Sequence, residues 1–217
     1  MVHEPIPEGY IEASNGWSWP YEFPIWNWEG NEGKPMQVRV FTKAPKVSLE
    51  LNGEVIGEKL LTTKDKYTAV FEVPYQPGEL KAIAIEDGKE IATKVLKTAG
   101  KPVAIRLTAD RTKLKADRND LSFIKIEVID ENGQLVPKDS IKINLTISGN
   151  GELAASGKAN PIDMGSVNNQ VINTYKGKAQ AIIRPFSTSG KIIIKAESEG
   201  LRSEELDLNI MKSSLGS

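Results

Sequence analysis

Residues that could bind or cleave a sugar are concentrated in the first 34 positions. This segment holds all four tryptophans, two tyrosines and a phenylalanine, namely Trp17, Trp19, Trp26, Trp28, Tyr10, Tyr21 and Phe23. Flat rings stack on pyranose faces, and concave binding sites combine such rings with a few polar groups. Glu29 and Glu32 lie beside them, and glycoside hydrolysis needs two carboxylates about 5–9.5 Å apart. Ordinary exposed turn carboxylates remain the favoured interpretation of this pair, because surface Asp and Glu are usually solvated.

The aromatic residues have three interpretations. Each ring can bury about 150–250 Å², whereas an exposed apolar patch on a soluble monomer rarely exceeds about 300–600 Å². The rings therefore pack on protein, bind a glycan, or form a self-association patch. We favour packing, on the following domain or at a seam with another domain, because aromatic side chains most often serve burial. The residues predicted to contact a sugar or another domain are the four tryptophans and Glu29.

Other catalytic machinery is missing from the sequence. The single histidine, His3, is expected in a flexible terminus, whereas a Ser-His-Asp relay needs an oriented imidazole. There is no HExxH motif and no Gly-rich phosphate loop. Cysteine is absent, which excludes disulfides, thiolate metal sites and a cysteine nucleophile. We therefore expect no catalytic residue, no metal and no cofactor in this chain.

Two weaker signals have ordinary explanations. Asp110, Asp117, Asn119 and Asp120 could offer oxygen ligands to calcium, but their spacing matches no EF-hand loop. We expect them to stabilise turns instead. Asn144-Leu145-Thr146 matches the glycosylation sequon, yet it is predicted in mid-strand with Leu145 facing inward. Neither signal is expected to be a functional site.

Charge and hydropathy exclude further classes. The formal net charge is −1 and no cluster of basic residues is present, which argues against a nucleic-acid surface. No apolar stretch approaches the roughly 18–20 residues of a membrane helix. No charged segment followed by an apolar one opens the chain, so we expect no signal peptide.

Alternating apolar and polar residues predict an all-β protein of two tandem immunoglobulin-like sandwiches. Asn52-Gly53 and Asp87-Gly88 are typical hairpin turns of the first sandwich. The expected strands of this sandwich are 38–40, 47–51, 55–61, 66–73, 80–86 and 90–98. Those of the second are 105–107, 124–128, 141–147, 177–184, 191–197 and 206–210. Residues 149–174 are expected to be a long connection.

The chain is thus divided into four parts. These are an aromatic leader at 1–34, a first sandwich at 35–99, a second sandwich at 100–211 and a disordered tail at 212–217. The first sandwich is small, and domains of about 60 residues bury only about 60% of their unfolded surface. The leader, folded over this sandwich, is expected to supply the missing apolar contacts.

The sequence resembles the region that follows the catalytic barrel in β-galactosidase-type proteins of glycoside hydrolase family 2. The first part of the resemblance is WNWEGNEGKPMQVRVFTKAPKVSLELNGEVIGEK from Trp26, continuing through KYTAVFEVPYQPGELKAIAIEDGKEIATKVLKTAGKP. The preceding PIPEGY and WSWPYEFPIWNWEG resemble the linker that leaves the barrel. IRLTADRTKLKADRNDLSFIKIEVIDENGQLVP resembles the next module, which is similar to bacterial invasin-type Ig-like repeats. ISGNGELAASGKANP and GKAQAIIRPFSTSGKIIIKAESEGL extend the match nearly to the end.

The resemblance implies a noncatalytic C-terminal fragment. In this family the two catalytic glutamates lie on the barrel, so none is carried over to this sequence. Trp26, Trp28, Glu29 and Gly30 match the WNWEG signature, to which no catalytic role is assigned. The implied parent is a retaining β-galactosidase, secreted or periplasmic, with its barrel as partner and with a homo-oligomer left open. An independent carbohydrate-binding module and an adhesin-like stalk are the alternatives.

Overall fold

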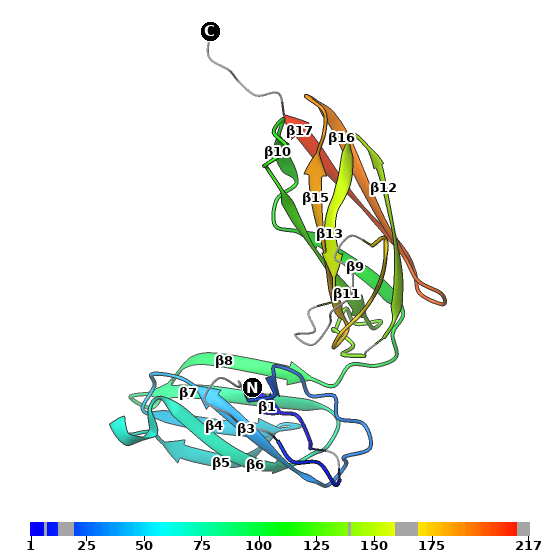
Figure 1. The fold of residues 1–217 in the computed structure, drawn as a ribbon. Coiled ribbons are helices and arrows are strands. Elements are labelled where there is room, and N and C mark those ends of the chain that lie inside the picture. Colours follow the sequence, from blue (N-terminus) through cyan, green and yellow to red (C-terminus); the bar gives the residue numbers. More distant parts are fainter. Residues whose placement is uncertain (7, 13–19, 139, 159–168, 212–217) are drawn as a thin grey trace. The chain divides into compact units, whose positions relative to one another are not determined.

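The computed structural model describes residues 1–6, 8–12, 20–138, 140–158 and 169–211. The chain divides into two compact units, Met1–Thr98 and Ala99–Ser217. Both units consist mainly of β-strands and turns, and Figure 1 shows each as a layered stack of strands. The predicted all-β fold class is confirmed. The predicted disordered tail lies outside the described residues, as do Trp17 and Trp19.

Unit 1 is a sandwich of two four-stranded antiparallel sheets. One sheet has the order β2-β1-β3-β6 and the other β5-β4-β7-β8. Their strands are β1 (Val2–His3), β2 (Glu22–Phe23), β3 (Pro35–Phe41), β4 (Lys46–Leu51), β5 (Glu54–Leu60), β6 (Thr68–Pro74), β7 (Glu79–Glu86) and β8 (Lys89–Lys97). A short 3₁₀ helix, η1, covers Thr63–Asp65. The core lies between the sheets, where Val38 and Phe71 of the first meet Leu49 and Leu80 of the second.

Both hairpins predicted from dipeptides are present. Asn52 and Gly53 have φ values of 52° and 87°, and Asp87 and Gly88 have φ values of 50° and 73°. A two-residue type I′ turn needs positive φ at both positions, which Asn, Asp and Gly tolerate best. These turns join β4 to β5 and β7 to β8.

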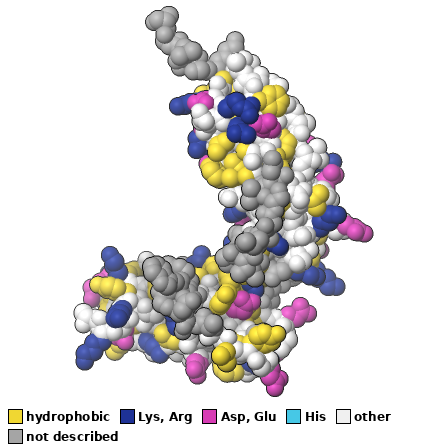
Figure 2. Space-filling model, viewed as in Figure 1, with side chains coloured by type: hydrophobic (Ala, Val, Ile, Leu, Met, Phe, Trp, Pro, Cys, Tyr) yellow, Lys and Arg dark blue, Asp and Glu magenta, His cyan; other side chains and the backbone are white. Residues whose placement is uncertain are grey.

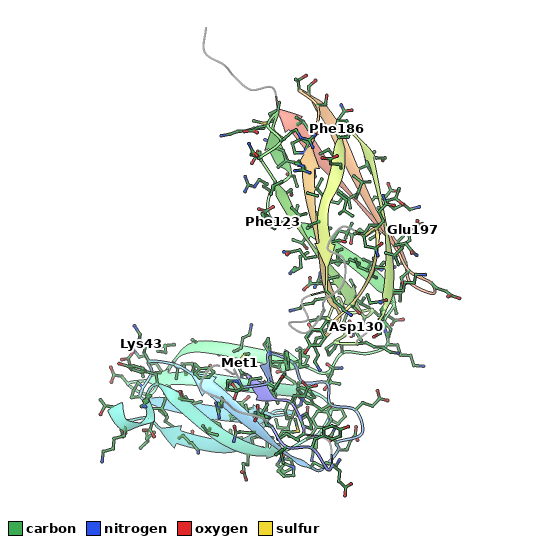
Figure 3. All side chains as sticks on the ribbon, in the orientation of Figure 1. Met1, Lys43, Phe123, Asp130, Phe186 and Glu197 are labelled. Atoms are coloured by element: carbon green, nitrogen blue, oxygen red, sulfur yellow. The ribbon has the colours of Figure 1, made fainter. Side chains whose placement is uncertain are left out.

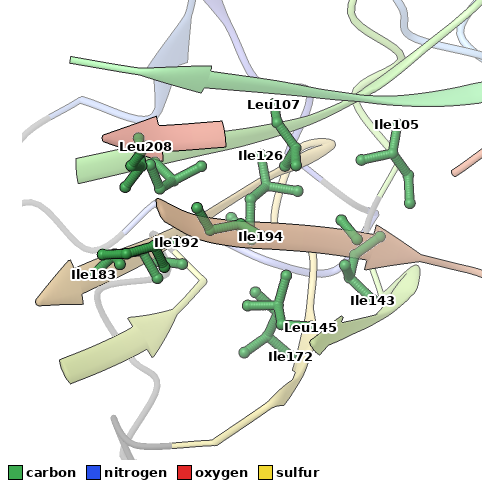
Figure 4. Close-up of a cluster of buried hydrophobic side chains, with 14 of the residues drawn as sticks. Ile105, Leu107, Ile126, Ile143, Leu145, Ile172, Ile183, Ile192, Ile194 and Leu208 are labelled. Atoms are coloured by element: carbon green, nitrogen blue, oxygen red, sulfur yellow. The ribbon is translucent and has the colours of Figure 1, made fainter. Parts of the chain in front are cut away.

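Unit 2 is a larger sandwich. Its sheets have the orders β13-β15-β11-β9 and β10-β17-β16-β12-β14. The strands are β9 (Ala104–Ala109), β10 (Lys113–Lys115), β11 (Ser122–Ile129), β12 (Lys142–Gly149), β13 (Gly151–Gly157), β14 (Val171–Asn173), β15 (Lys178–Pro185), β16 (Gly190–Glu197) and β17 (Glu204–Met211). All pairs are antiparallel except β10 with β17. Figure 4 shows the isoleucines and leucines of facing strands meeting in the core, including Ile126, Ile143, Ile194 and Leu208.

The expectation of a long connection over residues 149–174 is wrong in part. Residues 151–157 form β13, which pairs with β15, and residues 171–173 form β14, which pairs with β12. The β13 register shifts between Leu153 and Ala155, so a bulge interrupts the period-two alternation. The small residues of this strand gave no hydrophobic signal either, since only its first residue and Ser156 are fully buried.

Candidate functional site

The end of the aromatic leader is fixed inside unit 1. The side chain of Trp26 has no exposed surface, and its ring meets Tyr75 edge-on, with 5.0 Å between centroids. Trp26 Nε1 donates a hydrogen bond to the carbonyl of Gln76 (2.9 Å), and Thr98 Oγ1 donates to the carbonyl of Trp26 (2.6 Å). Ring, indole N–H and backbone are therefore all held by residues of the first sandwich.

Tyr75 is the partner that organises this region. Its hydroxyl accepts a hydrogen bond from the backbone N–H of Trp28 (3.0 Å). Its own backbone accepts from Gly33 N (2.8 Å) and donates to the carbonyl of Lys34 (2.9 Å). Tyr75 follows β6 directly, so the leader is bound to the segment between β6 and β7. A buried tyrosine whose hydroxyl has a partner is the favourable way to place this residue in a core.

Burial decides what these tryptophans can contact. Trp26 and Trp28 belong to the core of unit 1, so neither presents an open ring face to a sugar. Glu29 and Glu32 are exposed, and Glu32 Oε1 accepts only a local hydrogen bond from Gly30 N (3.2 Å). The two carboxylates lie in a turn, and neither lines the two cavities of unit 1 that are described below.

A cavity of about 390 Å³ lies in the first part of the leader. Its wall includes Tyr10, Ile11, Glu12 and Tyr21, and Tyr10 is 73% exposed. His3 also lines it, and His3 Nε2 lies 3.1 Å from Glu12 Oε2. The expectation of a flexible terminus around His3 is wrong, because His3 belongs to β1 and faces Glu22 of β2.

The described wall of the cavity combines tyrosine rings with carboxylates and apolar side chains. None of the described residues lining it is a serine, threonine or cysteine that the His3–Glu12 pair could activate. Exposed tyrosines beside a carboxylate instead suit a surface that contacts another molecule. Sequence reasoning missed this cavity because its wall is assembled from residues that show no strand alternation.

The acidic residues of unit 2 stabilise turns. Asp110 Oδ1 accepts from the backbone N–H groups of Arg111 and Phe123, both at 2.8 Å. Asp120 accepts from Arg111 Nη1 (2.8 Å) and Lys115 N (2.6 Å). Within the described parts of the chain, no group of three or more His, Cys, Asp or Glu side chains could hold a metal ion.

Three carboxyl groups of unit 2 have a lowered pKa. Burial alone would raise the pKa of Asp110, Glu127 and Asp130, but their hydrogen-bond donors outweigh it. For Glu127 these donors are Lys125 and Arg106, and Arg106 Nη2 lies 2.9 Å from its Oε2. For Asp130 they are three backbone N–H groups, those of Gly100, Asn132 and Gln134.

We expect unit 2 to lose stability in acid. The folded state holds protons on these three groups more weakly than the unfolded state does, so unfolding takes up protons. Their stabilisation is complete above the unfolded pKa of about 4, and it is lost as pH falls through the lower folded values. Urea unfolding of the chain from pH 6 to pH 2.5 would measure this loss. A free energy of unfolding that stays constant below pH 4 would contradict it.

The surface carries charges of both signs. Figure 2 shows Lys and Arg interspersed with Asp and Glu over both units. Asn144 of the sequon lies within β12, between β14 and β16, and Leu145 is buried, as predicted. Among the described residues, no helix has the length and apolar character needed to cross a membrane.

Two family models match the chain. Residues 105–207 match glycoside hydrolase family 2 C-terminal domain 5, and residues 33–92 match a domain of unknown function, DUF4982. A crystal structure of a family 2 glycosyl hydrolase from Bacteroides cellulosilyticus superposes with a TM-score of 0.89 at 35% identity. That match covers 97% of this chain and 28% of the other.

The chain belongs to the C-terminal accessory region of glycoside hydrolase family 2. Beta-galactosidase BoGH2A of Bacteroides ovatus is 37% identical over 86% of this chain and 22% of its own length. A beta-galactosidase of Thermoanaerobacter pseudethanolicus is 30% identical over 67% of this chain and 18% of its own. This family 2 region therefore spans about a fifth of the curated relatives that it matches.

Proposed function

We propose that this region is a noncatalytic accessory part of a larger family 2 glycosidase, a retaining β-galactosidase that acts in carbohydrate degradation outside the cytoplasm. The noncatalytic role is supported by the positions of the two glutamates beside the tryptophans. Glu29 and Glu32 are exposed turn residues, and Trp26 and Trp28 are buried structural residues. Both β-galactosidase relatives are several times longer than the matched region, which leaves room for a catalytic barrel in the parent.

The proposed task is mechanical support. The leader is joined by hydrogen bonds to the end of β6 and the end of β8, through Tyr75, Gln76 and Thr98. A linker held by these hydrogen bonds would keep the sandwich that follows in a fixed position relative to a barrel that precedes it. Unit 1 would thus hold the exit of the barrel in place, and the parent would be more resistant to unfolding with this region than without it.

We expect the isolated chain to fold and to hydrolyse no chromogenic β-galactoside. The longer gene product should hydrolyse o-nitrophenyl-β-galactoside, and its midpoint of thermal inactivation should fall when residues 35–217 are deleted. The control is the longer protein with its barrel glutamates replaced, which should be folded and inactive. Turnover by the isolated chain that disappears on Glu29→Gln or Glu32→Gln would contradict the proposal.

A second role, shaping one edge of the substrate cleft, is favoured by the cavity in the leader. Tyr10 and Tyr21 are exposed there beside Glu12, the combination that suits a sugar hydroxyl and a ring face. Tyr10→Ala in the longer enzyme should raise KM for an oligosaccharide more than for a nitrophenyl galactoside. Equal KM values for wild type and variant on both substrates would exclude this role. No feature of the residues that the structure describes favours an adhesin-like stalk.

A further inference from the structure

Strand β3 extends beyond the strand that pairs with it. Val2 faces Val38 across the β1–β3 ladder. Arg39 N donates to the carbonyl of Met1 (2.8 Å), and the amino group of Met1 donates to the carbonyl of Arg39 (2.8 Å). β3 continues through Val40 and Phe41, and β6 pairs with both on its other side. On the β1 side, no described residue is paired with either.

An apolar groove lies beside this unpaired stretch. Its volume is about 230 Å³, and its wall includes Val38 and Val40 of β3, Leu49 of β4, and Leu80 and Leu96 of β7 and β8. These residues belong to the inner faces of both sheets, so the groove is an opening into the core of unit 1. Met1 also lines it, and Figure 3 labels Met1 beside β1. The groove therefore begins where β1 begins.

Strand geometry fixes which side chain would enter the groove. Successive side chains of a strand point to opposite faces, and Val2 is completely buried. The residue immediately before Met1 would share the face of Val2, lie opposite Val40 and point into the groove. The residue before that one would lie opposite Phe41. Met1 and Arg39 form a hydrogen-bonded pair, and such pairs alternate along an antiparallel ladder, so Phe41 would gain the next pair of backbone hydrogen bonds.

We propose that in the longer protein the polypeptide preceding Met1 continues β1 along Val40 and Phe41 and closes the groove with an apolar side chain. This proposal rests on the proposed function, in which a larger glycosidase contains the polypeptide before Met1. Its chain position brings it to the groove without any intervening loop.

Two extensions of the 217-residue chain test the geometry. Released from a cleavable fusion, one carries Thr-Val before Met1, which places the valine over the groove. The other carries Val-Thr, which has the same composition and points the valine outward. We expect Thr-Val to raise the thermal midpoint of unit 1 by about 4–8 °C and Val-Thr to leave it close to that of the parent chain. Equal midpoints for the two extensions would overturn the inference.

Hydrogen exchange tests the occupant in the longer protein. The amide of Phe41 should exchange at least about ten times more slowly there than in the 217-residue chain, because its N–H then has an acceptor. Equal exchange rates would overturn the inference, even in a longer protein that hydrolyses β-galactosides. A protected Phe41 amide in a longer protein without any glycosidase activity would support the strand extension and overturn the proposed function alone.

Discussion

Replacing Trp26 by alanine is expected to destabilise unit 1 by about 3–5 kcal/mol, the range for removing a large aromatic side chain from a core. The change leaves a cavity against Tyr75 and removes the donor to the carbonyl of Gln76. Small domains have only about 5–15 kcal/mol of stability in total, so this loss is a large fraction of the stability of unit 1. Urea denaturation followed by circular dichroism measures the change.

Two variants separate packing from hydrogen bonding at Trp26. Trp26→Phe keeps a ring and loses the hydrogen bond, so it should cost less than the alanine variant. Tyr21→Ala removes a half-exposed aromatic residue of the same leader and should cost about 0.5 kcal/mol or less. A Trp26→Ala protein as stable as Tyr21→Ala would show that the leader does not support the sandwich.

Asp130→Ala is expected to destabilise unit 2 by about 2–3 kcal/mol, because it removes a buried carboxylate and leaves three part-buried backbone donors without their acceptor. The carboxylate accepts from Asn132 N and Gln134 N in its own turn, and from Gly100 N at the start of the unit. The variant should also lose less stability between pH 6 and pH 3 than wild type does. Denaturant titrations at the two pH values measure both effects.

Asp117→Ala is the matched control for Asp130. Asp117 also accepts a backbone hydrogen bond, from Asn119 N (2.9 Å), but it is exposed to solvent. Water can replace that acceptor, so the variant should be within about 0.5 kcal/mol of wild type. Similar losses for Asp117→Ala and Asp130→Ala would mean that burial of the carboxylate does not matter here.

Most of the fold could be predicted because the strands keep their alternation. Ile143 and Leu145 alternate with polar residues along β12, and both are buried in unit 2. The dipeptides Asn52-Gly53 and Asp87-Gly88 also predicted their turns correctly. β1 and β2 could not be predicted, because each has two residues and depends on partners far along the chain. β13 was missed for a local reason, the bulge that breaks its alternation.

The candidate site was less predictable than the fold. The number of aromatic rings before Gly30 indicated that some must be buried, and Trp26 and Trp28 are. The partner could not be identified, because the contact between Trp26 and Tyr75 joins residues far apart in sequence. The cavity beside Tyr10 likewise depends on how the leader folds back on itself. The alternation of apolar and polar residues and the amino-acid composition carry no information on such contacts.

The parallel pairing of β10 with β17 has a consequence for biosynthesis. Lys113 lies beside Asn209 in that ladder. β10, near the start of unit 2, can therefore pair only after β17 has left the ribosome. Unit 1 has all of its strands once residue 97 has emerged. During translation the first sandwich can therefore form before the second one, which closes only after residue 211 has emerged. Nascent chains stalled soon after residue 140 should already resist protease up to β8 and be digested beyond it.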